Sequence, residues 1–184
     1  PQHTHNYCAR EACYFLTDGT PKAMMEEPSS ANTPLQILTS VPQHVVLDKD
    51  EYAWASFGRK LYESASTANG AARTYVLNTP APVGGKSGLM RICFAASVTS
   101  TVTLTPTVNG EKKAEMKIGA HDDYDKAREE SALYYVPMNG NTTTVQLTPG
   151  SAYEGRLDFI ELTYARHLSM AGADEIVFHP TESG

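Results

Sequence analysis

The feature that most constrains the fold of this chain is an alternation of apolar and polar residues with a period of two. Between residues 90 and 98 every second residue is apolar, and the positions between them include Arg91, Cys93 and Ser97. A period of two places successive side chains on opposite faces of a β-strand, whereas an amphipathic helix requires a period of 3.6. The segment therefore predicts a strand with one dry and one wet face.

A tight hairpin is predicted directly after this strand. Val102, Leu104 and Val108 alternate with threonines, and Asn109-Gly110 follows them. Asn-Gly tolerates the positive φ angles that a two-residue hairpin turn requires. The alternation then resumes over residues 114–118, so the two segments are expected to pair in antiparallel fashion.

Further short strands are expected along the chain, separated by turn residues such as Asn139-Gly140-Asn141 and Pro149-Gly150. They are predicted at Cys13–Leu16, Val45–Leu47, Arg73–Asn78, Leu133–Met138, around Val145 and Leu147, at Ile160–Tyr164 with the alternation extending toward Leu168, and at Ile176–Phe178. About nine or ten strands of this kind predict an all-β fold, an antiparallel β-sandwich of the jelly-roll type with long N-terminal loops. Ala23–Pro34 is the longest predicted loop.

Two segments do not follow the strand pattern. Tyr52–Ser64 places Trp54, Phe57 and Leu61 at helical spacing, interrupted by a glycine, and Asp122–Ser131 is polar and predicts a short surface helix. The length of 184 residues suits one core, so residues 1–184 are predicted to form a single module, with residues 1–11 extended or mobile. Because the sequence begins at Pro1, the module is expected to belong to a larger protein.

Charge and hydropathy exclude two classes of partner. The formal net charge is −6 and no basic stripe occurs, so nucleic acid is not an expected partner. No apolar run approaches the length of a membrane span, so no membrane insertion by this segment is expected.

The cysteines do not predict a catalytic nucleophile. There are three, Cys8, Cys13 and Cys93, and an odd number does not fit a disulfide framework. Cys93 lies within a predicted strand, where no helix N-terminus or sharp turn lowers its pKa. We interpret these residues as small, half-buried thiols and expect no catalytic residues, because none of the six histidines lies in a recognisable catalytic loop.

Two groups of residues are candidates for binding. Asp122, Asp123 and Asp125 form a dense carboxylate cluster that could hold Ca²⁺, but the cluster lacks the glycine and the distal glutamate of a calcium loop, and we interpret it as a solvated turn without a cofactor. The candidate ligand-binding residues are aromatic. Tyr135 and Phe159 are predicted on the face opposite the core, and Trp54 is the single tryptophan.

Four segments carry a resemblance to a known family. In chain order, these segments are Cys13-Tyr14-Phe15-Leu16-Thr17-Asp18-Gly19-Thr20, Gly58-Arg59-Lys60-Leu61-Tyr62-Glu63-Ser64, the strands around Asn109-Gly110, and Gly155–Arg166 followed by Ile176–Phe178. They resemble the β-sandwich region that precedes the peptidase domain in PorU-like sortases of the type IX secretion system. These are gingipain-related cysteine peptidases of Bacteroidetes.

The resemblance implies a location and a role. The protein would be exported to the outer membrane or cell surface of a Gram-negative bacterium, where such enzymes cleave sorting domains from secreted cargo and attach the cargo to a lipid-linked sugar. The catalytic residues of that family lie in the peptidase domain and match nothing here. The module would pack on or orient the peptidase domain of the same polypeptide, with other secretion components or a glycan as further partners.

Two other function classes stay open. The first is a carbohydrate-binding jelly-roll module of a cell-surface protein, which has the same architecture and no catalysis. The second is an enzyme in its own right, which the sequence supports least because no pair of nucleophile and base can be named.

Overall fold

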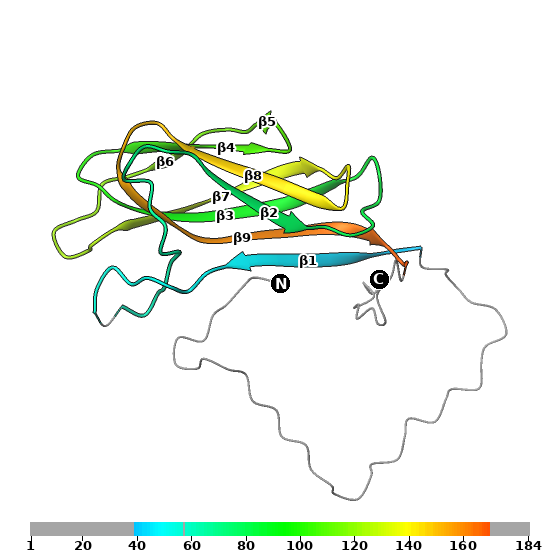
Figure 1. Cartoon of the computed structure of the whole chain (residues 1–184), viewed down its shortest axis with the longest axis horizontal. Coiled ribbons are helices and arrows are strands. Elements are labelled where there is room, and N and C mark those ends of the chain that lie inside the picture. The colour runs from blue at the N-terminus through cyan, green and yellow to red at the C-terminus, as the bar shows by residue number, and fades with distance from the viewer. Residues whose placement is uncertain (1–38, 57, 170–184) are drawn as a thin grey trace, which may run out of the picture.

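Two antiparallel sheets face each other in the computed structural model, which describes residues 39–56 and 58–169 (Figure 1). The first sheet, sheet I, has the order β1 (Ser40–Asp48), β9 (Glu154–His167), β3 (Ser87–Ser97), β7 (Arg128–Pro137). The second, sheet II, has the order β2 (Arg73–Asn78), β8 (Thr142–Pro149), β4 (Val102–Val108), β5 (Glu111–Lys112), and β6 (Met116–Ile118) also pairs with β4. The described part of the chain contains no helix capable of crossing a membrane.

The connectivity is that of a jelly roll. Strand β1 pairs with β9, β2 with β8, β3 with β7, and β4 with the short strands β5 and β6. If β5 and β6 are taken as one interrupted strand, the chain forms a long hairpin of nested pairs folded across two sheets, which is the double-sheet arrangement of a jelly roll. The predicted all-β sandwich is therefore confirmed.

The core lies between the sheets and follows the period of two. On β3, Met90 and Ile92 have no exposed surface, and Ile160 and Leu162 on β9 are equally buried. Sheet II contributes the alternating apolar residues of β4, β6 and β8, such as Leu104, which is fully buried. Because these side chains come from both sheets, they fill the space between the two inner faces.

The predicted hairpin forms at Asn109-Gly110. Both residues have positive φ angles, 50° and 83°, and Val108 pairs with Glu111 across the turn. Mirror-image turns of this kind match the twist of the flanking strands, which explains why this dipeptide is placed here. Pairing with β4 then breaks at residues 113–115 and resumes in β6.

The two helix predictions are wrong. The described residues of the segment 52–64 form no helix, because Tyr52 and Tyr62 pair as an isolated antiparallel bridge that makes the segment a loop. Within this segment Trp54 packs edge-on against Tyr52 and Tyr62, and the guanidinium of Arg156 lies over the rings of Tyr52 and Trp54. Residues 122–127 form an irregular loop, and residues 128–131 begin β7. Leu168 lies beyond β9 and is 36% exposed, so the apolar pattern ends at Tyr164.

Several predictions lie outside the described residues. They are the strands Cys13–Leu16 and Ile176–Phe178, the loop Ala23–Pro34, the extended segment 1–11, and the states of Cys8 and Cys13.

Candidate functional site

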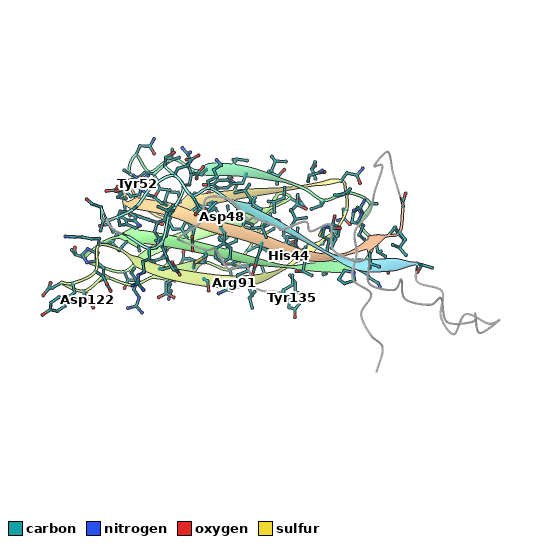
Figure 2. All side chains as sticks on the ribbon, turned by 90° about the horizontal axis from the view of Figure 1, so that it is seen from below. His44, Asp48, Tyr52, Arg91, Asp122 and Tyr135 are labelled. Atoms are coloured by element: carbon teal, nitrogen blue, oxygen red, sulfur yellow. The ribbon has the colours of Figure 1, made fainter. Side chains whose placement is uncertain are left out.

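The outer face of sheet I carries a row of exposed apolar side chains, which we call the apolar row. It consists of Leu89 on β3 and Leu133 and Tyr135 on β7, which are 41%, 64% and 75% exposed. Leu89 pairs directly with Tyr135 across the two strands. Figure 2 looks onto this sheet from below and shows Tyr135 at its surface, so the prediction that Tyr135 points away from the core is confirmed.

Phe159 also points to the outer face, as predicted, but little of its ring is accessible. It is 9% exposed, and the guanidinium carbon of Arg91 lies 5.6 Å from the ring centroid. The backbone partners of Phe159 are Asp48 on β1 and Cys93 on β3. The ring is therefore flanked on both sides by neighbouring strands, and the accessible aromatic of this face is Tyr135.

A shallow groove lies at one end of the same face, beside Tyr135. Its volume is about 350 Å³, and all four strands of sheet I line it, through Pro42, Thr163, Ala165, Leu89 and Tyr135. The lining is mostly apolar, so the groove continues the apolar row toward β1.

A polar group on this face has the composition of a hydrolase triad without its geometry. His44 Nδ1 lies 3.0 Å from Thr163 Oγ1, and His44 Nε2 lies 3.8 Å from a carboxylate oxygen of Glu161, which also faces Arg91 Nη1 at 3.7 Å. His44 and Thr163 are direct cross-strand partners in the β1–β9 ladder. Regular ladder pairing engages the backbone N–H groups that an oxyanion hole would need, so we interpret the group as a cross-strand polar network.

The other end of the outer face is covered by residues 49–56 and 58–64, which we call the cover loop. Its Tyr52 and Tyr62 exchange backbone hydrogen bonds of 2.8 Å in both directions, and Glu63 N–H donates to the carbonyl of Leu157 at the free edge of β9. Buried Arg156 lies with its guanidinium carbon 3.6 Å from the ring centroid of Tyr52 and donates to the Ser64 carbonyl. These contacts hold the loop against sheet I.

The cover loop packs over an acidic cluster that comes from three strands, in which Cys93 and Asp158 are buried and Glu129 is half-buried. Cys93 on β3, Glu129 on β7 and Asp158 on β9 place Sγ and carboxylate oxygens within 4.8 Å of one another. From the cover loop, Lys60 Nζ donates to both Glu129 oxygens at 2.7 and 2.6 Å, and the Tyr62 hydroxyl donates to Glu129 Oε2 at 3.3 Å. Asp158 lies at a register shift between β3 and β9, where a β-bulge leaves it as one extra, unpaired residue of β9.

The surroundings of this cluster favour the protonated forms of Asp158 and Cys93. Burial raises the pKa of Asp158 to about 6, and the neighbouring Glu129 carboxylate adds to the effect, whereas Cys93 and Lys60 oppose it. Burial also raises the pKa of the Cys93 thiol far above its usual range, with further contributions from Glu129 and Asp158. A thiol that stays protonated at neutral pH is not a nucleophile, so this cluster does not supply cysteine-protease chemistry.

Among the described residues, this is the one group of three or more potential metal ligands close enough to share an ion. Lys60 already supplies a positive charge to Glu129 at hydrogen-bonding distance.

The acidic group predicted from the sequence, Asp122, Asp123 and Asp125, has a different arrangement. Asp122 Oδ1 accepts the backbone N–H groups of Tyr124 and Asp125 at 3.0 and 2.9 Å, so its side chain stabilises the turn itself.

A second concave region lies between the cover loop and residues 124–127, and we call it the loop groove. Its volume is about 330 Å³. Trp54 and Asp125, both singled out from the sequence for different reasons, line the same groove together with Arg59, Lys126 and Tyr124. The structure thus brings Trp54 next to the acidic loop and separates it from Tyr135, which lies at the other groove.

Sequence reasoning missed the acidic cluster and the cations of the loop groove. Asp158 gave one usable signal, because a carboxylate between Leu157 and Phe159 interrupts an otherwise apolar strand segment. Nothing in the sequence indicated that Glu129, on a strand predicted as a helix, would join it.

Comparison with protein-family models and with curated proteins finds no match. Among solved structures, the chain is similar to dimeric latent PorU from Porphyromonas gingivalis, with a TM-score of 0.65 and 16% identity, and the match covers 77% of this chain but only 14% of PorU. It is also similar to a family 35 carbohydrate-binding module from an environmental isolate (TM-score 0.46, 15% identity, 69% of this chain and 91% of the module) and to another from Clostridium thermocellum (TM-score 0.44, 15% identity, 68% and 98%).

The observed fold defines a class. At such identities the PorU match shows a shared fold, and the two weaker matches carry no further weight. The chain is a β-sandwich module, and the described residues present no assembled catalytic site.

Proposed function

We propose that this chain is the accessory β-sandwich module of a secretion-linked, sortase-like cysteine peptidase, and that it packs against and orients the peptidase domain of the same polypeptide. The observation that carries the proposal is the apolar row on the outer face of sheet I. The order of sequence motifs and the fold shared with part of PorU support the choice of enzyme class. The module would act at the outer membrane or cell surface of a Gram-negative bacterium.

The apolar row has the chemistry of an interface. Leu89, Leu133 and Tyr135 lie on adjacent strands and continue into a shallow apolar groove. By contrast, the outer face of sheet II is rich in threonine, and Val76 is its one large exposed hydrophobic residue among those described. Contiguous exposed apolar side chains mark interaction surfaces, and tyrosine is enriched at their centres. Sheet I is therefore the better docking face.

A binding experiment with variants of both sheets tests this proposal. The module would be titrated with the separately produced peptidase domain that follows it in its polypeptide, and the affinity measured by calorimetry. A double variant, Leu133→Ser and Tyr135→Ser, is expected to weaken binding at least about ten-fold, or about 1.4 kcal/mol. Val76→Ser, which removes an exposed apolar residue from sheet II, should leave binding unchanged. Equal binding by wild type and the double variant would refute the proposed surface, and a polypeptide without a peptidase domain would refute the function.

A second candidate function is carbohydrate binding, and one observation favours it. Trp54 and Tyr124 lie together in the loop groove, and aromatic rings offer sugars a flat apolar surface. Screening against a glycan array tests this candidate independently of docking. Loss of binding in Trp54→Ala or Tyr124→Ala would support it, whereas loss in Tyr135→Ala alone would place a sugar site on sheet I instead.

A further inference from the structure

We propose that the loop groove binds acidic saccharides, sugar rings that carry a carboxylate or a phosphate group. The inference rests on the carbohydrate-binding candidate above and names the chemical class of its ligand. It is carried by the charges that gather in the groove, by its aromatic side chains and by its size.

The charge of the loop groove is opposite to that of the chain. The protein has a formal net charge of −6, yet the groove is lined by Arg59, Lys60 and Lys126 against one carboxylate, Asp125. Lys60 pairs with Glu129 at 2.6 Å, so its charge is already compensated. Arg59 and Lys126 are exposed, and neither makes an ion pair with the described residues. Within the part of the chain that the structure describes, Arg59 and Lys126 are therefore the two cations of this groove that remain available to an anionic ligand.

The two cations are placed to act on one ligand. Arg59 belongs to the cover loop and Lys126 to the loop before β7, so they approach the groove from separate segments. A guanidinium group presents parallel N–H donors that match the oxygens of a carboxylate or a phosphate, and an ammonium group adds a point charge. Because both side chains are exposed, they are solvated in the free protein and accessible to a ligand.

The aromatic residues supply the neutral part of the site. Trp54 is held in place by edge contacts to Tyr52 and Tyr62, with ring centroids 5.4 and 6.2 Å apart, and by Arg156 at 5.6 Å. Tyr124 is 96% exposed and has room to move onto a ligand. A fixed indole and an adjustable phenol together offer surface for the C–H face of a sugar ring.

The size of the groove limits the ligand to a few sugar rings. Its volume of about 330 Å³ lies at the lower end of the range for small-molecule sites. The groove is open, so a longer chain could extend beyond it while one or two residues fill it.

Calorimetric titration with matched ligand pairs tests the inference. The first pair is tetragalacturonate and its carboxyl-reduced tetragalactose counterpart, and the second pair is mannose 6-phosphate and mannose. We expect at least one acidic member to bind about ten-fold more tightly than its neutral partner, with affinity that falls as salt is raised. The pair that shows the preference identifies carboxylate or phosphate as the recognised group.

Variants locate the site. Arg59→Gln, Lys126→Gln and Tyr124→Ala should each weaken binding about five-fold or more, whereas Lys117→Gln, an exposed lysine on sheet II, should not. Because these side chains are exposed, the variants should keep the wild-type melting temperature, which separates lost binding from unfolding. Equal affinity for acidic and neutral members would overturn the acidic class and leave the carbohydrate candidate intact. Binding that is insensitive to all three variants would overturn the location, and no binding of any sugar would overturn both.

Discussion

Replacing Asp158 by Asn is expected to stabilise the protein more strongly near pH 8 than near pH 4.5. Asp158 is 9% exposed and faces Glu129 and Cys93 beneath the cover loop. Burial, with the help of the Glu129 carboxylate, raises the pKa of Asp158 from 3.8 to about 6. An asparagine has nearly the same shape, cannot ionise, and can donate a hydrogen bond to Glu129.

The sign and size follow from proton linkage. Since the folded state holds the Asp158 proton more tightly than the unfolded state, the contribution of this group to stability is greatest below about pH 4 and is lost as the pH rises through about 6. At about 1.36 kcal/mol per pKa unit, the full shift corresponds to about 3 kcal/mol. Solvent screening reduces this value, so we expect Asp158→Asn to gain about 1 to 2 kcal/mol at pH 8 relative to pH 4.5.

Urea denaturation at both pH values measures the effect, and Asp123→Asn is the matched control. Asp123 is exposed, so its replacement removes the same formal charge without relieving a buried carboxylate. The quantity of interest is the change in unfolding free energy of each variant relative to wild type at the two pH values. If Asp158→Asn and Asp123→Asn respond equally to pH, or if Asp158→Asn is less stable than wild type at pH 8, the buried-carboxylate account is wrong.

Three further predictions concern the core, the acidic loop and the thiol. Ile160→Asp or Leu162→Asp should abolish soluble folded protein, because each buries an unpaired charge at a cost of several kcal/mol, whereas Leu133→Asp on the outer face should fold. Circular dichroism and the melting temperature distinguish these outcomes, and an unchanged melting point for Ile160→Asp would contradict the assigned core. A chelator should leave the melting temperature unchanged and added Ca²⁺ should not raise it, because the Asp122 side chain already accepts two backbone N–H groups; a reversible shift would instead indicate an ion site. Cys93 should react with iodoacetamide more slowly than free cysteine at neutral pH, because burial raises its pKa, and rapid saturable labelling by a peptide electrophile would show an enzyme.

The sequence predicted the strands well where one face is dry. The alternation at residues 90–98 corresponds to β3, and Asn109-Gly110 turns with both φ angles positive. The local pattern is sufficient to predict these strands, because apolar residues lie on the face toward the core and polar residues on the face toward solvent. At residues 52–64 the same reasoning failed, because Tyr52 and Trp54 pack on Arg156, which is about one hundred positions away in the sequence.

Binding residues were predicted in part. The outward direction of Tyr135 followed from alternation alone. The low exposure of Phe159 did not, because it depends on Arg91 from the neighbouring strand. The meeting of Trp54 with Asp125 in the loop groove depends on how two loops approach each other over the end of sheet I.

Local sequence was enough to predict antiparallel strands, several of their turns, and which side chains of the alternating strands face the core, because these properties depend on neighbouring residues. The tertiary structure decided which strands pair. Strand β1 pairs with β9 across more than one hundred residues, and the turn at residues 139–141 joins β7 and β8, which lie in different sheets. It also decided that Cys93, Glu129 and Asp158 share one buried site under Lys60. Such contacts arise only when a jelly roll folds its long hairpin across two sheets, since no local pattern records the partner of a strand.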